Sequence, residues 1–136
     1  IAQFIAQKCN KVIGIDIVKE SINAAKTNSK NNDIKNPFFE YGDIKNLFNE
    51  LFVKKYGSPD LIITDPPRNG MHKDVVKQIL SIKPNKIIYV SCNSSTQARD
   101  LSYLYRSYKM SRCRAVDMFP HTNHIENVVL LENNEI

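Results

Sequence analysis

Short runs of apolar residues alternate along this chain with longer stretches in which apolar and charged residues mix. The apolar runs have the length of buried strands, and they are Val12–Ile15, Phe38–Tyr41, Leu61–Thr64 and Lys86–Val90. Between the first two runs, Val18, Ile22 and Ala25 recur at i, i+4 and i+7 with lysines on the opposite side. This spacing predicts a helix over 18–31. The patterns predict further helices over 45–55, 73–81 and 95–108.

The C-terminal part of the chain departs from this alternation. Residues 112–119 and 125–132 both have the pattern of strands, and only a short turn around Pro120 separates them. Alternating strands and helices favour a parallel sheet with helices on both faces. We therefore expect an α/β fold in one domain over 1–136. Its sheet is expected to be mostly parallel and doubly wound, with an antiparallel hairpin at one edge.

Composition and charge narrow the class of protein. The 136 residues suffice for one domain with its own core, and the net charge of +5 weakly favours a polyanionic partner such as RNA or DNA. Three widely spaced cysteines without a CxxC motif argue against a zinc site or a disulfide framework, and they suggest a reducing, cytoplasmic setting. No apolar run is long enough to span a membrane.

The start of the chain has an unusual pattern. Residues 1–6, Ile-Ala-Gln-Phe-Ile-Ala, contain no initiator methionine and read as the middle of a helix. We therefore expect the chain to be a fragment of a longer protein.

Reactive side chains follow each of the four predicted parallel strands. Asp16, Asp43, Asp65 and Cys92 stand at the four strand ends. In open α/β sheets, ligands bind outside the carboxyl ends of the strands. Three acids and a thiol at one edge therefore predict an active site there.

The three acids carry different weight. An Asp after a strand commonly caps the next helix, and for Asp16 this reading stands equal with binding a ribose hydroxyl pair. Asp43 fits capping or solvent exposure better. Asp65 precedes Pro66-Pro67-Arg68, and two prolines make a stiff turn with exposed carbonyls. Such a turn favours a functional role for Asp65.

A free cysteine is most often a small buried hydrophobe, and this reading suffices for Cys9 and Cys113. Cys92 differs, because it stands between a strand end and a helix start. The helix dipole and amide donors there favour a thiolate. Arg68 and Arg99 could add positive charge.

The segment before the last strand, HTNHIE, holds His121, His124 and Glu126. Two histidines and a glutamate suggest a metal site, but the segment leads into a strand and lacks a third convincing ligand. Glu126 begins an otherwise apolar run, where burial of a carboxylate is costly without a function. A glutamate on a surface strand edge is the alternative.

Three motifs together, SCNSSTQARD, DPPRNG and HTNHIENVVLL, resemble those of the S-adenosylmethionine-dependent RNA uracil-C5 methyltransferases. The resemblance covers nearly the whole chain and implies a Rossmann-like class I methyltransferase fold. It implies S-adenosylmethionine as methyl donor and a uridine in RNA as substrate. Ribosomal RNA is slightly preferred over transfer RNA, and neither a metal nor a membrane is implied.

The resemblance also assigns roles to residues. It implies that Cys92 is the nucleophile, Glu126 the general base, and Asp65 part of the donor and uracil site. Asp16 would hold the ribose of the donor, and Asp43 would lie near the adenine. The residues expected to contact the RNA are Arg68, Asn93 and Arg99.

Two departures from the family pattern are visible. Ser94 stands where the family usually has proline, which changes the stiffness of that turn. The first strand and the glycine-rich loop of the family, together with its N-terminal domains, are expected to be missing, since residues 1–6 resemble the helix that follows that loop.

The implied chemistry requires a thiolate that adds to carbon 6 of a uracil flipped out of a loop. Two alternatives remain. Another Rossmann-like nucleic-acid methyltransferase could use the proline turn to hold an exocyclic amine, without a need for Cys92 or Glu126. A non-catalytic RNA-binding module would account only for the positive charge.

Overall fold

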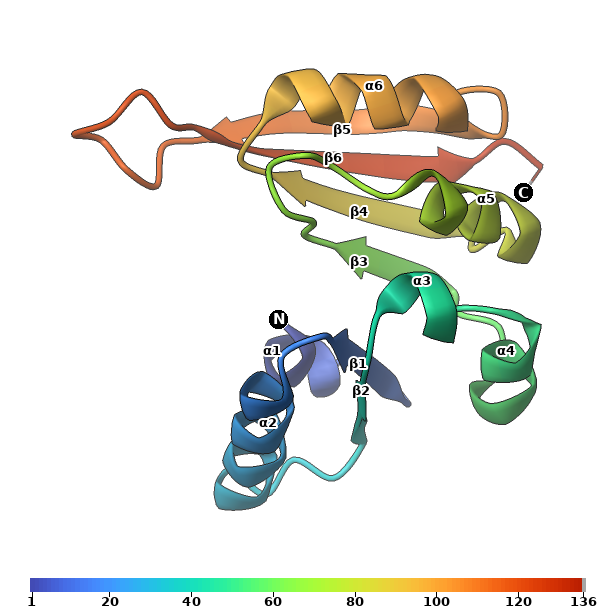
Figure 1. Ribbon diagram of the computed structural model, residues 1–136, viewed down its shortest axis with the longest axis vertical. Helices are drawn as coiled ribbons and strands as arrows, with labels where there is room; N and C mark the ends of the chain where they lie inside the picture. The colour runs from blue at the N-terminus through green and yellow to red at the C-terminus, as the bar shows by residue number, and fades with distance from the viewer. Residues whose placement is uncertain (136) are drawn as a thin grey trace. The chain divides into compact units, whose positions relative to one another are not determined.

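The computed structural model describes residues 1–135, which divide into two compact units, Ile1–Phe52 and residues 53–135. Figure 1 labels the helices and strands of each unit. Hydrogen-bonded strands lie in two sheets, one in each unit.

The first unit is built around two parallel strands. Its elements are α1 (Ala2–Ala6), β1 (Val12–Asp16), α2 (Lys19–Asn31), β2 (Pro37–Tyr41), α3 (Ile44–Leu47) and the start of α4 (Glu50–Tyr56). β1 pairs with β2 in parallel from Val12 opposite Pro37 to Asp16 opposite Tyr41. The carboxyl ends of both strands therefore lie next to each other.

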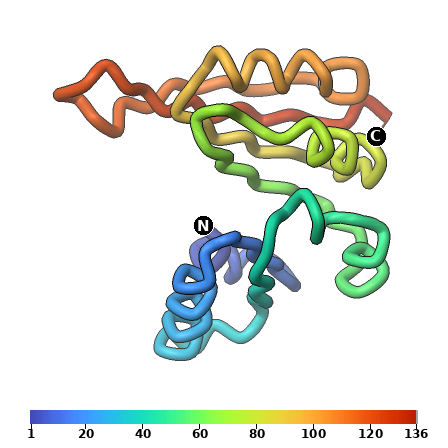
Figure 2. Tube along the Cα trace, viewed as in Figure 1, coloured from blue at the N-terminus to red at the C-terminus, as the bar shows by residue number. Residues whose placement is uncertain are grey.

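The second unit holds a mixed sheet. Its elements are β3 (Leu61–Thr64), α5 (Lys73–Ile82), β4 (Lys86–Ser91), α6 (Ser94–Leu104), β5 (Tyr108–Val116) and β6 (Glu126–Asn133). The strand order is β3-β4-β6-β5, with β3 and β4 parallel and β6 antiparallel to both of its neighbours. Figure 2 traces how the chain leaves β5 through an extended loop and returns as β6 between β4 and β5.

The core of the second unit lies on the face of the sheet that α5 and α6 cover. In β4, Ile87, Tyr89 and Ser91 are 0%, 0% and 1% exposed. The strand residues between them are less buried, as the two-residue period of a strand requires. Val129 and Leu131 of β6 complete this layer at 1% and 3% exposure. Helices α5 and α6 contact one another over it (Figure 1).

The α/β fold class and the antiparallel C-terminal hairpin agree with the expectation from sequence. The expected helix over 45–55 is wrong, because it is two helices, α3 and α4. Asn49 interrupts the pattern, since its Oδ1 accepts hydrogen bonds from the backbone amides of Leu51 (3.0 Å) and Phe52 (3.2 Å) and so starts a new helix.

The end of the last helix and the start of the following strand also differ from expectation. α6 ends at Leu104 rather than at residue 108, and β5 spans Tyr108–Val116 rather than 112–119. Tyr108 is 2% exposed, and its hydroxyl donates to the carbonyl of Pro84 at 3.0 Å. This tertiary contact holds Tyr108 in the sheet, so the strand begins there.

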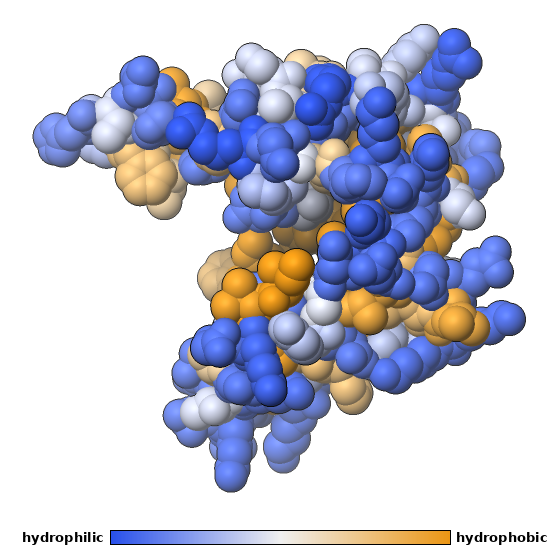
Figure 3. Space-filling view, in the orientation of Figure 1, coloured by the Kyte–Doolittle hydropathy of each residue, from blue (hydrophilic) through white to orange (hydrophobic). Residues whose placement is uncertain are grey.

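Among residues 1–135, no helix is long and apolar enough to cross a membrane. Hydrophilic side chains cover most of the face seen in Figure 3. The loop between β5 and β6, at the left of that view, exposes apolar atoms, and its residues Met118 and Phe119 are 60% and 54% exposed.

Candidate active site

Cys92 lies where the sequence predicts it, between a strand and a helix. β4 ends at Ser91, and α6 begins at Ser94 with Asn93 as its N-cap. The Oδ1 atom of Asn93 accepts hydrogen bonds from the backbone amides of Ser95 (3.1 Å) and Thr96 (3.5 Å). Cys92 is partly buried. The chain therefore presents it one step before a capped helix N-terminus.

The register of β4 and β6 relates Cys92 to Glu126. These antiparallel strands pair from Lys86 opposite Glu132 to Ser91 opposite Asn127. This last pair stands directly before Cys92 and directly after Glu126, the first residue of β6. Both residues therefore lie at the same end of this pair of strands, although they come from distant parts of the sequence.

A buried amide pair holds the start of β6 against α6. Gln97 is 1% exposed, and its Nε2 donates to the carbonyls of Tyr89 (3.0 Å) and Asn127 (3.2 Å). In return, the Nδ2 of Asn127 donates to the Oε1 of Gln97 at 2.6 Å. Sequence reasoning missed both residues. The polar Asn127 inside an apolar run was the signal that could have found them.

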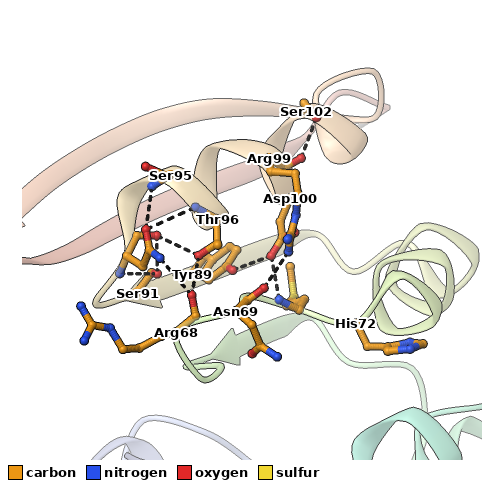
Figure 4. A network of polar contacts seen from close by, with 12 residues as sticks. Arg68, Asn69, His72, Tyr89, Ser91, Ser95, Thr96, Arg99, Asp100 and Ser102 are labelled. Carbon is orange, nitrogen blue, oxygen red and sulfur yellow. Dashed lines mark hydrogen bonds and ion pairs between the residues drawn. The ribbon is translucent and has the colours of Figure 1, made fainter.

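The Asp-Pro-Pro-Arg segment ends in a tight turn over Pro67–Gly70, which the hydrogen bond from the Gly70 amide to the Pro67 carbonyl closes at 2.8 Å. Side chains of α6 and its N-cap donate hydrogen bonds to the carbonyls of this turn (Figure 4). The Arg68 carbonyl accepts from Asn93 Nδ2 (3.1 Å) and Thr96 Oγ1 (3.0 Å). The Asn69 carbonyl accepts from Arg99 Nη2 at 2.9 Å. The carbonyls of Pro67, Arg68 and Asn69 are thus bonded within the protein rather than exposed.

Asp100, which sequence reasoning missed, is the buried centre of this network (Figure 4). Its side chain is 1% exposed. Its Oδ2 accepts from the Met71 amide and from the Tyr89 hydroxyl, each at 2.7 Å. Its Oδ1 accepts from Nε (3.0 Å) and Nη2 (2.7 Å) of Arg99. Four donors therefore compensate the burial of the carboxylate charge.

The pKa values of the partners of Asp100 follow from these contacts. Burial, and then the hydrogen bond to Asp100, raise the pKa of Tyr89 above its ordinary value. The hydrogen bond to Asp100 also raises the pKa of Arg99. The Tyr89 hydroxyl therefore stays protonated and remains a donor to the carboxylate.

The side chains of the turn lie at the surface. Asp65 is exposed directly after β3, whose last pair sets Thr64 opposite Tyr89 of β4. The exposed Arg68 lies with its Nη2 3.3 Å from Nδ1 of His124, two residues before Glu126. The structure thus brings the turn next to the segment that leads into β6. Asn93 and Arg99, expected to contact RNA, bind the turn with their side chains.

In the first unit, Asp16 and Asp43 stand at neighbouring strand ends, since the Gly42 amide donates to the Asp16 carbonyl at 2.9 Å. The Oδ1 of Asp16 accepts from the Val18 amide at 2.8 Å, and the Oδ1 of Asp43 accepts from the Lys45 amide at 2.9 Å. Asp43 thus caps α3, as sequence reasoning allowed, whereas Asp16 closes a turn before α2, whose N-cap is Val18 without a side-chain hydrogen bond. Each carboxylate has a second oxygen that can accept further hydrogen bonds.

The fold is similar to the Rossmann-like fold of methyltransferases of known structure. One solved structure of this class, the N-methyltransferase NodS from Bradyrhizobium japonicum, has a TM-score of 0.75 at 11% identity and covers 97% of this chain and 71% of its own. More specifically, the model of the tRNA (Uracil-5-)-methyltransferase family matches residues 42–134. The chain belongs to this family.

Individual members of the family are similar over nearly the whole chain. The tRNA (uracil-54, C5)-methyltransferase from Pyrococcus abyssi is 35% identical with a TM-score of 0.80, over 94% of this chain and 30% of its own. An uncharacterized RNA methyltransferase from Bacteroides thetaiotaomicron is 54% identical over 97% of this chain and 29% of its own length. An uncharacterized RNA methyltransferase from Porphyromonas gingivalis is 51% identical over 98% of this chain and 29% of its own length. The chain spans less than a third of these relatives.

Proposed function

We propose that the protein to which this chain belongs methylates carbon 5 of a uridine in RNA, with S-adenosylmethionine as methyl donor. The observation that carries the proposal is the β4–β6 pairing, whose last pair, Ser91 opposite Asn127, adjoins both Cys92 and Glu126. Family membership supports it. The Pyrococcus abyssi relative, described as a tRNA (uracil-54, C5)-methyltransferase in complex with S-adenosyl-L-homocysteine, supports both the substrate class and the donor.

Asp16 and Asp43 fit the donor. Their carboxylates lie at neighbouring ends of parallel strands, where α/β folds bind nucleotides. One oxygen of each is held by a backbone amide, so the other can accept a hydrogen bond from a ribose hydroxyl or an adenine amine. When bound, S-adenosylmethionine supplies the electrophilic methyl group.

Cys92 and Glu126 divide the chemistry between them. The Cys92 thiolate attacks carbon 6 of the uracil, and the electron pair displaced in the ring makes carbon 5 nucleophilic. After methylation at carbon 5, Glu126 removes the proton from that carbon. The carbon–sulfur bond then breaks, which restores the ring double bond and releases the thiolate.

The substrate is a uridine that leaves its stack, since the thiol cannot reach carbon 6 inside a helix. The exposed Arg68 can contact a phosphate near the target. Asn93 and Arg99 act on the RNA through the turn that they hold. Transfer and ribosomal RNA both fit. The reaction needs a reduced thiol, which fits a cytoplasmic setting.

The first prediction tests the nucleophile with the full-length protein. Uridine replaced by 5-fluorouridine has no proton on carbon 5 for a base to remove, so the covalent adduct should persist and be visible as a shifted band. Cys92→Ala should abolish the adduct and RNA methylation. Cys113→Ala, which changes an exposed cysteine on β5, should keep both. Methylation by Cys92→Ala would refute the proposal.

The second prediction concerns the base. Glu126→Gln should still form the carbon–sulfur bond but release product slowly, because the amide cannot take the carbon 5 proton. The adduct with ordinary uridine RNA should therefore accumulate in denaturing gels. Glu132→Gln is the control on the same strand, where the glutamate pairs with Lys86 at 3.1 Å. Equal turnover of Glu126→Gln and wild type would exclude Glu126 as the base.

A further inference from the structure

We propose that one face of α6 positions the reactive turn relative to the nucleophile, with the buried Asp100 as the central positioning residue. This α6 face consists of Asn93, Thr96, Arg99 and Asp100. The inference rests on the proposed function, because it assigns a catalytic consequence to a network that does not itself touch the reacting atoms.

The spacing of the α6 face matches the helix. Its residues recur at i, i+3, i+6 and i+7, so they lie on one side of α6 and its N-cap. They bind the Arg68 and Asn69 carbonyls of the turn and the amide of Met71, the residue that follows the turn. Because Asn93, the N-cap of α6, directly follows Cys92, one helix connects the residue after the nucleophile to the turn.

The turn packs so closely against α6 that no side-chain atom fits at Gly70. A Cβ atom added at Gly70 would lie 2.6 Å from both the Nη2 of Arg99 and the Oδ2 of Asp100. Hydrogen bonds to a carboxylate are shorter and stronger than those between neutral groups. The 2.7 Å bond from the Met71 amide to Asp100 has this character. A neutral acceptor would hold the turn less firmly.

The turn lies between Asp65 and the segment that bears the base. It follows Asp65 and Pro66, and the Nη2 of its Arg68 lies 3.3 Å from the Nδ1 of His124, two residues before Glu126. The α6 face thus links the nucleophile, the turn and the segment that bears the base. Because a misplacement of about 1 Å can cost a factor of about 100 in rate, loosening the turn should slow the chemistry more than it weakens RNA binding.

Two buried tyrosines provide a matched test in the full-length protein. Tyr89→Phe removes the hydroxyl that donates to Asp100, and Tyr108→Phe removes one that donates to the Pro84 carbonyl away from the turn. Both side chains are at most 2% exposed, so both variants should lower the unfolding midpoint, and Tyr89→Phe should lower it more because it leaves a buried carboxylate with one donor fewer. Tyr89→Phe should slow adduct formation with 5-fluorouridine RNA about tenfold, with little change in KM for RNA. Tyr108→Phe should stay within about twofold of wild type.

A second pair changes the Thr96 hydroxyl. Thr96→Val keeps the shape but removes the hydroxyl that donates to the Arg68 and Asn93 carbonyls, whereas Thr96→Ser keeps the hydroxyl. Thr96→Val should slow adduct formation, whereas Thr96→Ser should form the adduct at nearly the wild-type rate. Equal adduct rates for Tyr89→Phe and Tyr108→Phe, or for the Val and Ser variants, would overturn the inference. Absence of an adduct in the wild-type protein would instead overturn the proposed function.

Discussion

At the scale of single residues, Gly70 shows most clearly how closely the turn approaches α6. Its φ of +80° lies in the left-handed region that side chains rarely adopt, and the helix face leaves no room for a Cβ atom. Gly57 has a similar φ of +90°, but a Cβ atom added there would meet nothing within 4 Å. Substitution of Gly57 therefore tests backbone strain alone, whereas substitution of Gly70 tests backbone strain together with the close contact to α6.

This comparison gives the third prediction. Gly57→Ala should lower the free energy of unfolding by about 1–2 kcal/mol, the cost of a left-handed alanine. Gly70→Ala should cost at least about 1 kcal/mol more, because Arg99 and Asp100 must move. Urea denaturation of the full-length variants measures both. Equal costs would show that the helix face yields to the added methyl group.

At the scale of elements, α6 depends on Asn93 in two ways. Its Oδ1 caps the helix, and its Nδ2 donates to the Arg68 carbonyl. An aspartate at this position can cap the helix but cannot donate. The two functions of Asn93 can therefore be separated by substitution.

The fourth prediction follows from this difference. Asn93→Ala should lose both contacts and cost about 1 kcal/mol or more, whereas Asn93→Asp should retain the cap. Hydrogen exchange should then show that Asp protects the first amides of α6 as in wild type while the amides of residues 69–71 exchange faster. Faster exchange of the α6 amides in Asn93→Asp would contradict the capping role.

The strands are the elements that the sequence predicts best. Leu61–Thr64 agrees at both ends, because a short apolar run bounded by prolines permits little else. The start of β5 at Tyr108 was missed, since a contact with distant Pro84 places that residue in the sheet. The β4–β6 register could not be derived either, because pairing between distant segments depends on packing. The hydrogen bonds of Asp100 could not be predicted either, because they also join segments that are distant in the sequence.

At the scale of the whole molecule, buried tyrosines link stability to alkaline pH. Burial, and then the charge of Glu135, raise the pKa of Tyr108 from 10.0 to about 12. Below pH 10 its contribution to stability is fully present. As the pH rises from 10 towards 12, the unfolded chain loses this proton more readily than the folded protein, so the contribution is lost.

The fifth prediction uses Tyr108→Phe in a second measurement. Phenylalanine does not titrate, so the urea midpoint of this variant should fall less steeply than that of wild type between pH 10 and about 12. Below pH 9 the difference between the two proteins should be constant. Parallel curves across the alkaline range would show that Tyr108 titrates alike in the folded and unfolded states.

The central claim is that Cys92 forms a covalent bond to the substrate base. The most direct measurement incubates the full-length protein with S-adenosylmethionine and 5-fluorouridine RNA, digests both polymers and locates the added mass by peptide mass spectrometry. We expect a methylated fluorouridine nucleotide on the peptide that contains Cys92. RNA methylation by the same preparation with ordinary RNA, but no added mass on Cys92 with the fluorinated RNA, would contradict the account.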